Sequence, residues 1–89
     1  MVGYAIIFDE RVRRHIELLK AARLEQKAKA LIDILRSNPF KNPPPFEKLQ
    51  GNLNGLYSRR INIRHRLVYQ VFEKEKIVRI LSMWSHYDF

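Results

Sequence analysis

The feature that most limits the possible folds is a long segment without helix breakers. Residues 10–36 contain neither glycine nor proline, and apolar residues recur at helical spacing in two series, one beginning at Val12 and the other at Ala28. A single helix of this length would measure about 40 Å, whereas a compact domain of this size is roughly 30 Å across. We therefore predict a helical hairpin that breaks near Ala22-Arg23-Leu24, where the two series fall out of phase, and that ends at Asn38-Pro39.

Strand-like runs lie on both sides of this hairpin. Residues 3–8 are β-branched and aromatic, which predicts a buried strand, and three further runs follow at residues 56–63, 66–72 and 77–87. The last three are joined by short polar connections, which imply antiparallel neighbours. We expect one α+β domain spanning residues 1–89, with a two-helix hairpin packed on one face of a small antiparallel sheet.

Charge is the next constraint, because it indicates the kind of partner. The 17 Lys and Arg outnumber the 9 Asp and Glu, which gives a formal charge of +8 and a pI of about 10.2, and such a field favours a polyanion. A basic pI alone is also common in small domains that bind no nucleic acid. The distribution is more informative: no acidic residue lies between Lys48 and Phe72, where five cations gather, namely Lys48, Arg59, Arg60, Arg64 and Arg66.

Alternation along the strands predicts which side chains share a face. Along the run 56–63 and the residue that follows it, Arg60 and Arg64 lie on the opposite side from Arg59 and Ile61. One face of the sheet is expected to be apolar and to take the helices. The other carries arginines and can be left open to a ligand.

Several classes of site and location are excluded or disfavoured. The chain has no cysteine, which removes disulfides, thiolate zinc sites and thiol nucleophiles. The histidines, His15, His65 and His86, are scattered, so no metal site or other cofactor is expected. Apolar runs are too short to cross a bilayer and the N-terminus does not resemble a secretion signal, so we expect a cytoplasmic protein.

RNA cleavage needs none of the excluded groups. A ribose 2′-hydroxyl can attack the adjacent phosphorus if one group removes its proton, another protonates the leaving 5′-oxygen, and a cation stabilises the phosphoryl charge. Glu47, His86 and Arg66 are residue types that can do this, and Glu47 follows a stiff Pro43-Pro44-Pro45 segment that delivers it to the sheet. Taken singly, each is more simply read as an ordinary surface residue.

A longer sequence pattern favours a functional role for these three residues. Residues 49–62 read LQGNLNGLYSRRIN, residues 65–69 read HRLVY, and the chain nears its end with His86-Tyr87. Together with Pro39-Phe40, these motifs closely resemble the YoeB (Txe) family of bacterial toxins within the RelE-like group. The resemblance extends over roughly residues 39–87. Towards the N-terminus only the order of strand and helices agrees.

The resemblance implies a microbial-ribonuclease-like fold and metal-independent cleavage of messenger RNA in the A site of the 70S ribosome. It also implies inhibition by a YefM/Axe-type antitoxin, and it suggests a homodimer. By motif, Glu47 would be the general base, His86 the general acid and Arg66 the transition-state cation. With the basic patch added, the expected RNA-binding residues are Lys48, Arg59, Arg60, Arg64 and Tyr87.

The chain departs from the family pattern in places, and other functions compete. Gln50 stands where relatives often carry lysine, and Asp88-Phe89 extends past the usual His-Tyr ending. A basic nucleic-acid-binding module without chemistry, or a docking surface for an acidic protein, would need the same cations. Neither would need a general base, so the presence of Glu47 with Arg66 and His86 favours an enzyme.

Overall fold

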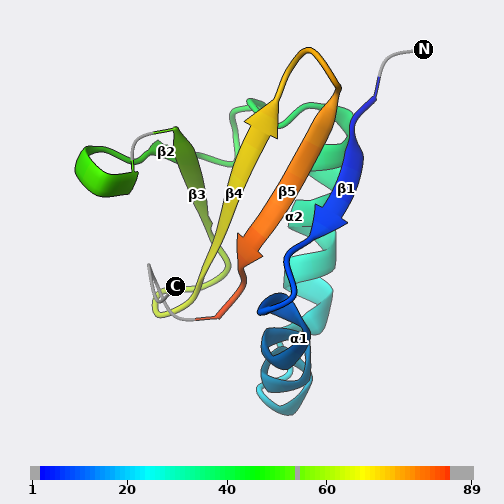
Figure 1. Ribbon diagram of the computed structural model, residues 1–89. Coiled ribbons are helices and arrows are strands. Elements are labelled where there is room, and N and C mark those ends of the chain that lie inside the picture. Colours follow the sequence, from blue (N-terminus) through cyan, green and yellow to red (C-terminus); the bar gives the residue numbers. More distant parts are fainter. Residues whose placement is uncertain (1–2, 54, 85–89) are drawn as a thin grey trace.

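The computed structural model describes residues 3–53 and 55–84. Two helices, α1 (Val12–Ala21) and α2 (Glu25–Ser37), lie against one face of a five-stranded sheet in this part of the chain (Figure 1). The strands are β1 (Ala5–Phe8), β2 (Glu47–Lys48), β3 (Leu56–Arg60), β4 (Arg66–Phe72) and β5 (Ile77–Ser82), and a short 3₁₀ turn spans Gly51–Leu53. The sheet order is β1-β5-β4-β3-β2, and the predicted α+β class with a helical hairpin is confirmed.

The helical hairpin breaks at the predicted place. Arg23 adopts a left-handed backbone with φ of 60°, the Arg23 N–H donates to the Lys20 carbonyl, and the Leu24 N–H donates to the Leu19 carbonyl. This pair of bonds is a Schellman motif, which commonly ends a helix with glycine in the left-handed position. Here an arginine takes that position, which is why no turn residue marks the break.

The sheet differs from the prediction at its edge. Strands β2 to β5 pair antiparallel, as expected, but β1 pairs with β5 in parallel. The predicted burial of β1 is wrong: it is an edge strand, and Ile7 and Phe8 are each 45% exposed. An apolar run of this length does not distinguish a central strand from an edge strand, because only one of its faces has to meet the core.

The core lies between the helices and the sheet. The helices contribute Val12 and Leu19 from α1 and Ala28, Leu31 and Leu35 from α2, and the sheet side includes Tyr69, Val78 and Ile80. Residues that alternate with this sheet set point to the opposite, helix-free face. None of the helices in the described residues is long and apolar enough to cross a membrane.

The connection between β3 and β4 is longer than predicted, because β3 ends at Arg60 and β4 begins at Arg66. The Asn62 side-chain oxygen accepts hydrogen bonds from the N–H groups of Arg64 (2.9 Å) and His65 (2.8 Å), while the Ile61 N–H donates to the His65 carbonyl. This turn fixes the start of β4, where Arg66 lies.

Candidate active site

Three neighbouring strands place the principal site residues on the helix-free face. Glu47 of β2 is the register partner of Ser58 on β3, and Arg60 of β3 is the partner of Arg66 on β4. Register partners point to the same side of a sheet, as do residues two apart in one strand. Glu47, Ser58, Arg60 and Arg66 therefore share one face.

Glu47 and Arg66 are in direct contact. The Arg66 Nη1 donates to the Glu47 Oε1 at 2.8 Å, with the Glu47 side chain 63% exposed and that of Arg66 23% exposed. A cleft of about 210 Å³ opens beside them, and it is lined by Pro45, Phe46, Glu47, Ser58, Arg60 and Arg66. A carboxylate and two guanidinium groups thus border one open space.

Arg59 requires a correction. It was expected to contact RNA, but it is 1% exposed, and its guanidinium donates to the carbonyls of Pro44 (2.6 Å), Lys41 (2.9 Å) and Pro39 (3.0 Å). The guanidinium also lies 5.1 Å from the centroid of the Phe46 ring. Because its Nη1 and Nη2 groups bind carbonyls inside the protein, Arg59 anchors the proline-rich segment in front of β2 rather than facing the cleft.

The remaining predicted residues lie apart from the cleft or outside the described chain. Lys48 is exposed, but it pairs with Tyr57 and so points away from the face that carries Glu47. Arg64 is exposed in the turn before β4 and does not line the cleft. His86 and Tyr87 lie outside the described residues.

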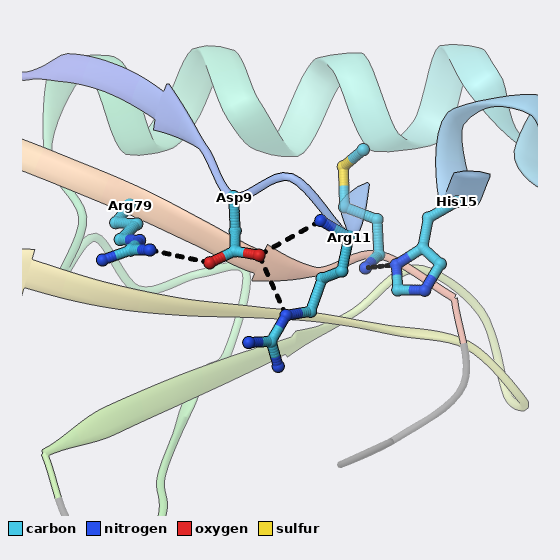
Figure 2. Close-up of polar contacts among 5 residues, drawn as sticks. Asp9, Arg11, His15 and Arg79 are labelled. Carbon is cyan, nitrogen blue, oxygen red and sulfur yellow. Dashed lines mark hydrogen bonds and ion pairs between the residues drawn. The ribbon is translucent and has the colours of Figure 1, made fainter. Parts of the chain in front are cut away.

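A second polar cluster lies between β1, β5 and the start of α1 (Figure 2). Asp9 accepts hydrogen bonds from the backbone N–H of Arg11 (3.1 Å), from its Nε (2.9 Å) and from Arg79 Nη2 (2.7 Å). These bonds, led by the one from the Arg11 backbone, outweigh burial and lower the pKa of Asp9 below its usual range. The cluster borders a cleft of about 570 Å³, and none of the predicted site residues lines that cleft. The hydrogen bonds of Asp9 connect the end of β1 to β5 and to the start of α1, which is a structural role.

Comparison with known proteins identifies the family. The family model for the YoeB-like toxin of bacterial type II toxin-antitoxin systems matches residues 14–87. The chain belongs to this family.

Individual relatives agree with this membership. A Toxin YoeB from Synechocystis is 37% identical over 66 residues, which is 74% of this chain and 74% of that protein. Among solved structures, a YoeB/ParE toxin from Agrobacterium tumefaciens has a TM-score of 0.83 at 27% identity and covers 93% of this chain and 99% of its own. A YoeB-YefM complex from Staphylococcus aureus has a TM-score of 0.78 at 31% identity, covering 94% and 98%.

In this YoeB-family chain, two histidines without a predicted role contact the two residues that follow β5. The Met83 N–H donates to the Nδ1 of the buried His15 (3.1 Å; Figure 2). The Trp84 carbonyl accepts the Arg66 N–H (3.2 Å) and lies 3.2 Å from the Nδ1 of His65, whose ring stacks on Trp84 at 4.0 Å. These contacts fix the residues from which the chain continues towards His86.

Ser58 and Phe46 also line the cleft, and no sequence pattern indicates a functional role for either. Phe46 packs against Tyr57 with ring centroids 6.0 Å apart and forms one wall, while Ser58 is 1% exposed. A serine within a strand carries no distinctive sequence signal. The register of β2 against β3 reveals its place next to Glu47.

Proposed function

We propose that this YoeB-family chain is an endoribonuclease that cleaves messenger RNA in the ribosomal A site by attack of a ribose 2′-hydroxyl. The observation that carries the proposal is the contact between Glu47 and Arg66 at the mouth of a cleft that Arg60 also lines. A 2′-hydroxyl and its neighbouring phosphate are adjacent groups of one nucleotide. Because Glu47 and Arg66 are in contact, the carboxylate can reach the 2′-hydroxyl while the guanidinium reaches the neighbouring phosphate.

Each group has a defined task in the proposed reaction. Glu47 removes the proton of the 2′-hydroxyl, the 2′-oxygen forms a bond to phosphorus, and the bond from phosphorus to the 5′-oxygen breaks. Arg66 donates hydrogen bonds to the phosphoryl oxygens, where negative charge increases. His86 protonates the departing 5′-oxygen, and the products are a 2′,3′-cyclic phosphate and a free 5′-hydroxyl.

The remaining cations and Tyr87 serve binding in this proposal. Arg60 lines the cleft and can contact a phosphate flanking the cut, while Lys48 and Arg64 are exposed and can add contacts to ribosomal or messenger RNA. Tyr87 is proposed to hold the substrate by stacking on a base or bonding a phosphate. The charge of +8 supports attraction to the ribosome, which is a polyanion.

We further propose a YefM/Axe-type antitoxin as the physiological inhibitor. The Staphylococcus aureus relative forms a complex with YefM, which supports a partner of this kind. An acidic segment that folds across the face bearing Arg60 and Arg66 would block the cleft, and its association should be fast and sensitive to salt. An inhibitor that binds only the helices and leaves both arginines accessible would contradict this mechanism.

The test is cleavage of messenger by the purified protein on programmed ribosomes. Glu47→Gln, Arg66→Ala and His86→Gln should each lower the rate at least about a hundredfold, because one acid or base contributes about 10²–10⁴ and one donor to the developing charge about 10²–10³. Glu73→Gln, at an exposed position in the β4–β5 turn, is the matched control and should cleave normally.

Loss of folding should not complicate the test. The Glu47–Arg66 pair is partly exposed, and such pairs contribute only about 0.2–1 kcal/mol to stability. If the wild-type protein binds ribosomes but leaves the messenger intact, the competing assignment as a non-catalytic binding module is correct.

A further inference from the structure

The side chain of Ser58 is buried, and its hydroxyl lacks a hydrogen-bond partner among the described residues. Ser58 is 1% exposed, and its Oγ has no hydrogen-bond partner within the structure described. Buried polar groups are nearly always paired, because leaving one unpaired costs free energy. An alanine at this position would avoid that cost, so the hydroxyl requires an explanation.

The unpaired hydroxyl belongs to the cleft that Glu47 and Arg66 border. Glu47 is the register partner of Ser58, while Arg66 is the partner of Arg60, two residues further along β3. The ion pair that joins Glu47 on β2 to Arg66 on β4 must therefore cross β3 between positions 58 and 60. Ser58 points to the same face of the sheet, so its side chain lies next to this crossing.

The surrounding charges indicate which ligand the hydroxyl can take. Arg60 and Arg66 line the same cleft, and two guanidinium groups favour an anion such as phosphate. A serine hydroxyl can donate to an anionic oxygen, and such a bond is stronger than one between neutral groups.

We propose that Ser58 is a substrate-binding residue that donates a hydrogen bond to a phosphoryl oxygen of the RNA. This inference rests on the proposed function for the identity of the phosphate as that of RNA. In the free protein the Glu47–Arg66 ion pair spans β3 next to Ser58. When the phosphate accepts hydrogen bonds from Arg66, the ion pair opens, Glu47 turns to the 2′-hydroxyl, and the Ser58 hydroxyl gains its partner.

The inference makes an unusual prediction for Ser58→Ala, since stability and activity should separate. The midpoint of urea unfolding should stay the same or rise, because the variant loses an unpaired polar group and no hydrogen bond. The single-turnover rate of messenger cleavage should fall about ten- to a hundredfold, the range expected for a hydrogen bond to a charged group. A lower midpoint with a normal rate would mean that the hydroxyl has a structural partner, and the inference would be wrong.

A second measurement keeps this inference separate from the proposed function. Inorganic phosphate can be titrated against the whole chain while the amide signals of Ser58 and Arg66 are followed by NMR. Phosphate affinity should fall about tenfold in Ser58→Ala and stay unchanged in Ser82→Ala, a buried serine of the same sheet that does not line the cleft. If the wild-type protein cleaves no messenger, the proposed function fails, yet this comparison still decides the role of Ser58. Equal phosphate affinity in the wild-type and Ser58→Ala proteins overturns it.

Discussion

Arg59 and Arg60 are adjacent arginines to which the structure gives opposite roles, and replacing each by methionine tests this directly. Methionine has a similar length but neither charge nor donors. Arg59 donates to three backbone carbonyls, and hydrogen bonds to a charged group contribute about 1.5–3 kcal/mol each. Arg60 is exposed at the end of β3.

The expected loss at Arg59 is smaller than the sum of its three bonds. The Pro39 carbonyl keeps a second donor, the Tyr69 hydroxyl at 2.8 Å, and the carbonyls of Lys41 and Pro44 are at partly buried positions where water can replace the guanidinium. Removing a buried charge also recovers part of its desolvation cost. We therefore expect Arg59→Met to lose about 2–4 kcal/mol, a large share of the roughly 5–15 kcal/mol of a typical domain.

Urea unfolding and RNA binding together provide the assay. With an m-value of about 2 kcal/mol per molar urea, the middle of the range for small proteins, the Arg59→Met midpoint should fall by roughly 1–2 M. Arg60→Met should change stability by less than about 0.5 kcal/mol. The salt dependence of single-stranded RNA affinity should decrease in Arg60→Met by the amount expected for about one phosphate contact, and it should stay unchanged in Arg59→Met. A wild-type midpoint together with a weakened salt dependence in Arg59→Met would refute the structural role of this residue.

Three further predictions concern stability. Asp9→Asn should be about 1 kcal/mol less stable than wild type at pH 7. Because the pKa of Asp9 is lowered in the folded protein, this difference in stability should shrink when urea unfolding is measured below about pH 4. Burial raises the pKa of Tyr69 and favours its neutral form, so the wild-type protein should lose stability above about pH 10, whereas Tyr69→Phe should not. At pH 7 that variant should be about 1 kcal/mol less stable than wild type, because it lacks the hydrogen bond to the Pro39 carbonyl. Arg23→Gly should stabilise the protein by about 0.5–1 kcal/mol, because glycine adopts the left-handed conformation without steric cost, and the thermal midpoint should rise accordingly.

Much of the fold could be predicted because it depends on local patterns. The spacing of apolar residues after Val12 and Ala28 determined both helices, and their loss of phase located the break even though Arg23 stands where glycine is usual. The edge position of β1 could not be predicted, because it depends on which strand pairs with β5. That pairing is set by the path of the whole chain and not by residues 5–8.

The site shows the same division. The chemistry of Glu47 and Arg66 and their motif predict a functional role, but their contact depends on the register of three strands, which no local pattern reveals. Alternation already placed Arg59 on the apolar face with Ile61, and that signal, given more weight than its charge, predicts its burial. No sequence signal marks Ser58, because its position next to the Glu47–Arg66 ion pair is known only from the strand register.

The central claim is that a ribose 2′-hydroxyl, activated by Glu47, is the nucleophile, and one substitution in the messenger tests it most directly. A single 2′-deoxynucleotide at the cut position removes the nucleophile while most phosphate contacts, and therefore binding, remain. Purified protein should cut the normal messenger on ribosomes to give a 2′,3′-cyclic phosphate and a downstream 5′-hydroxyl, and should leave the deoxy-substituted messenger uncut. Normal cutting of the deoxy-substituted messenger, with a 5′-phosphate on the downstream fragment, would show that water is the nucleophile and would contradict the roles proposed for Glu47 and His86.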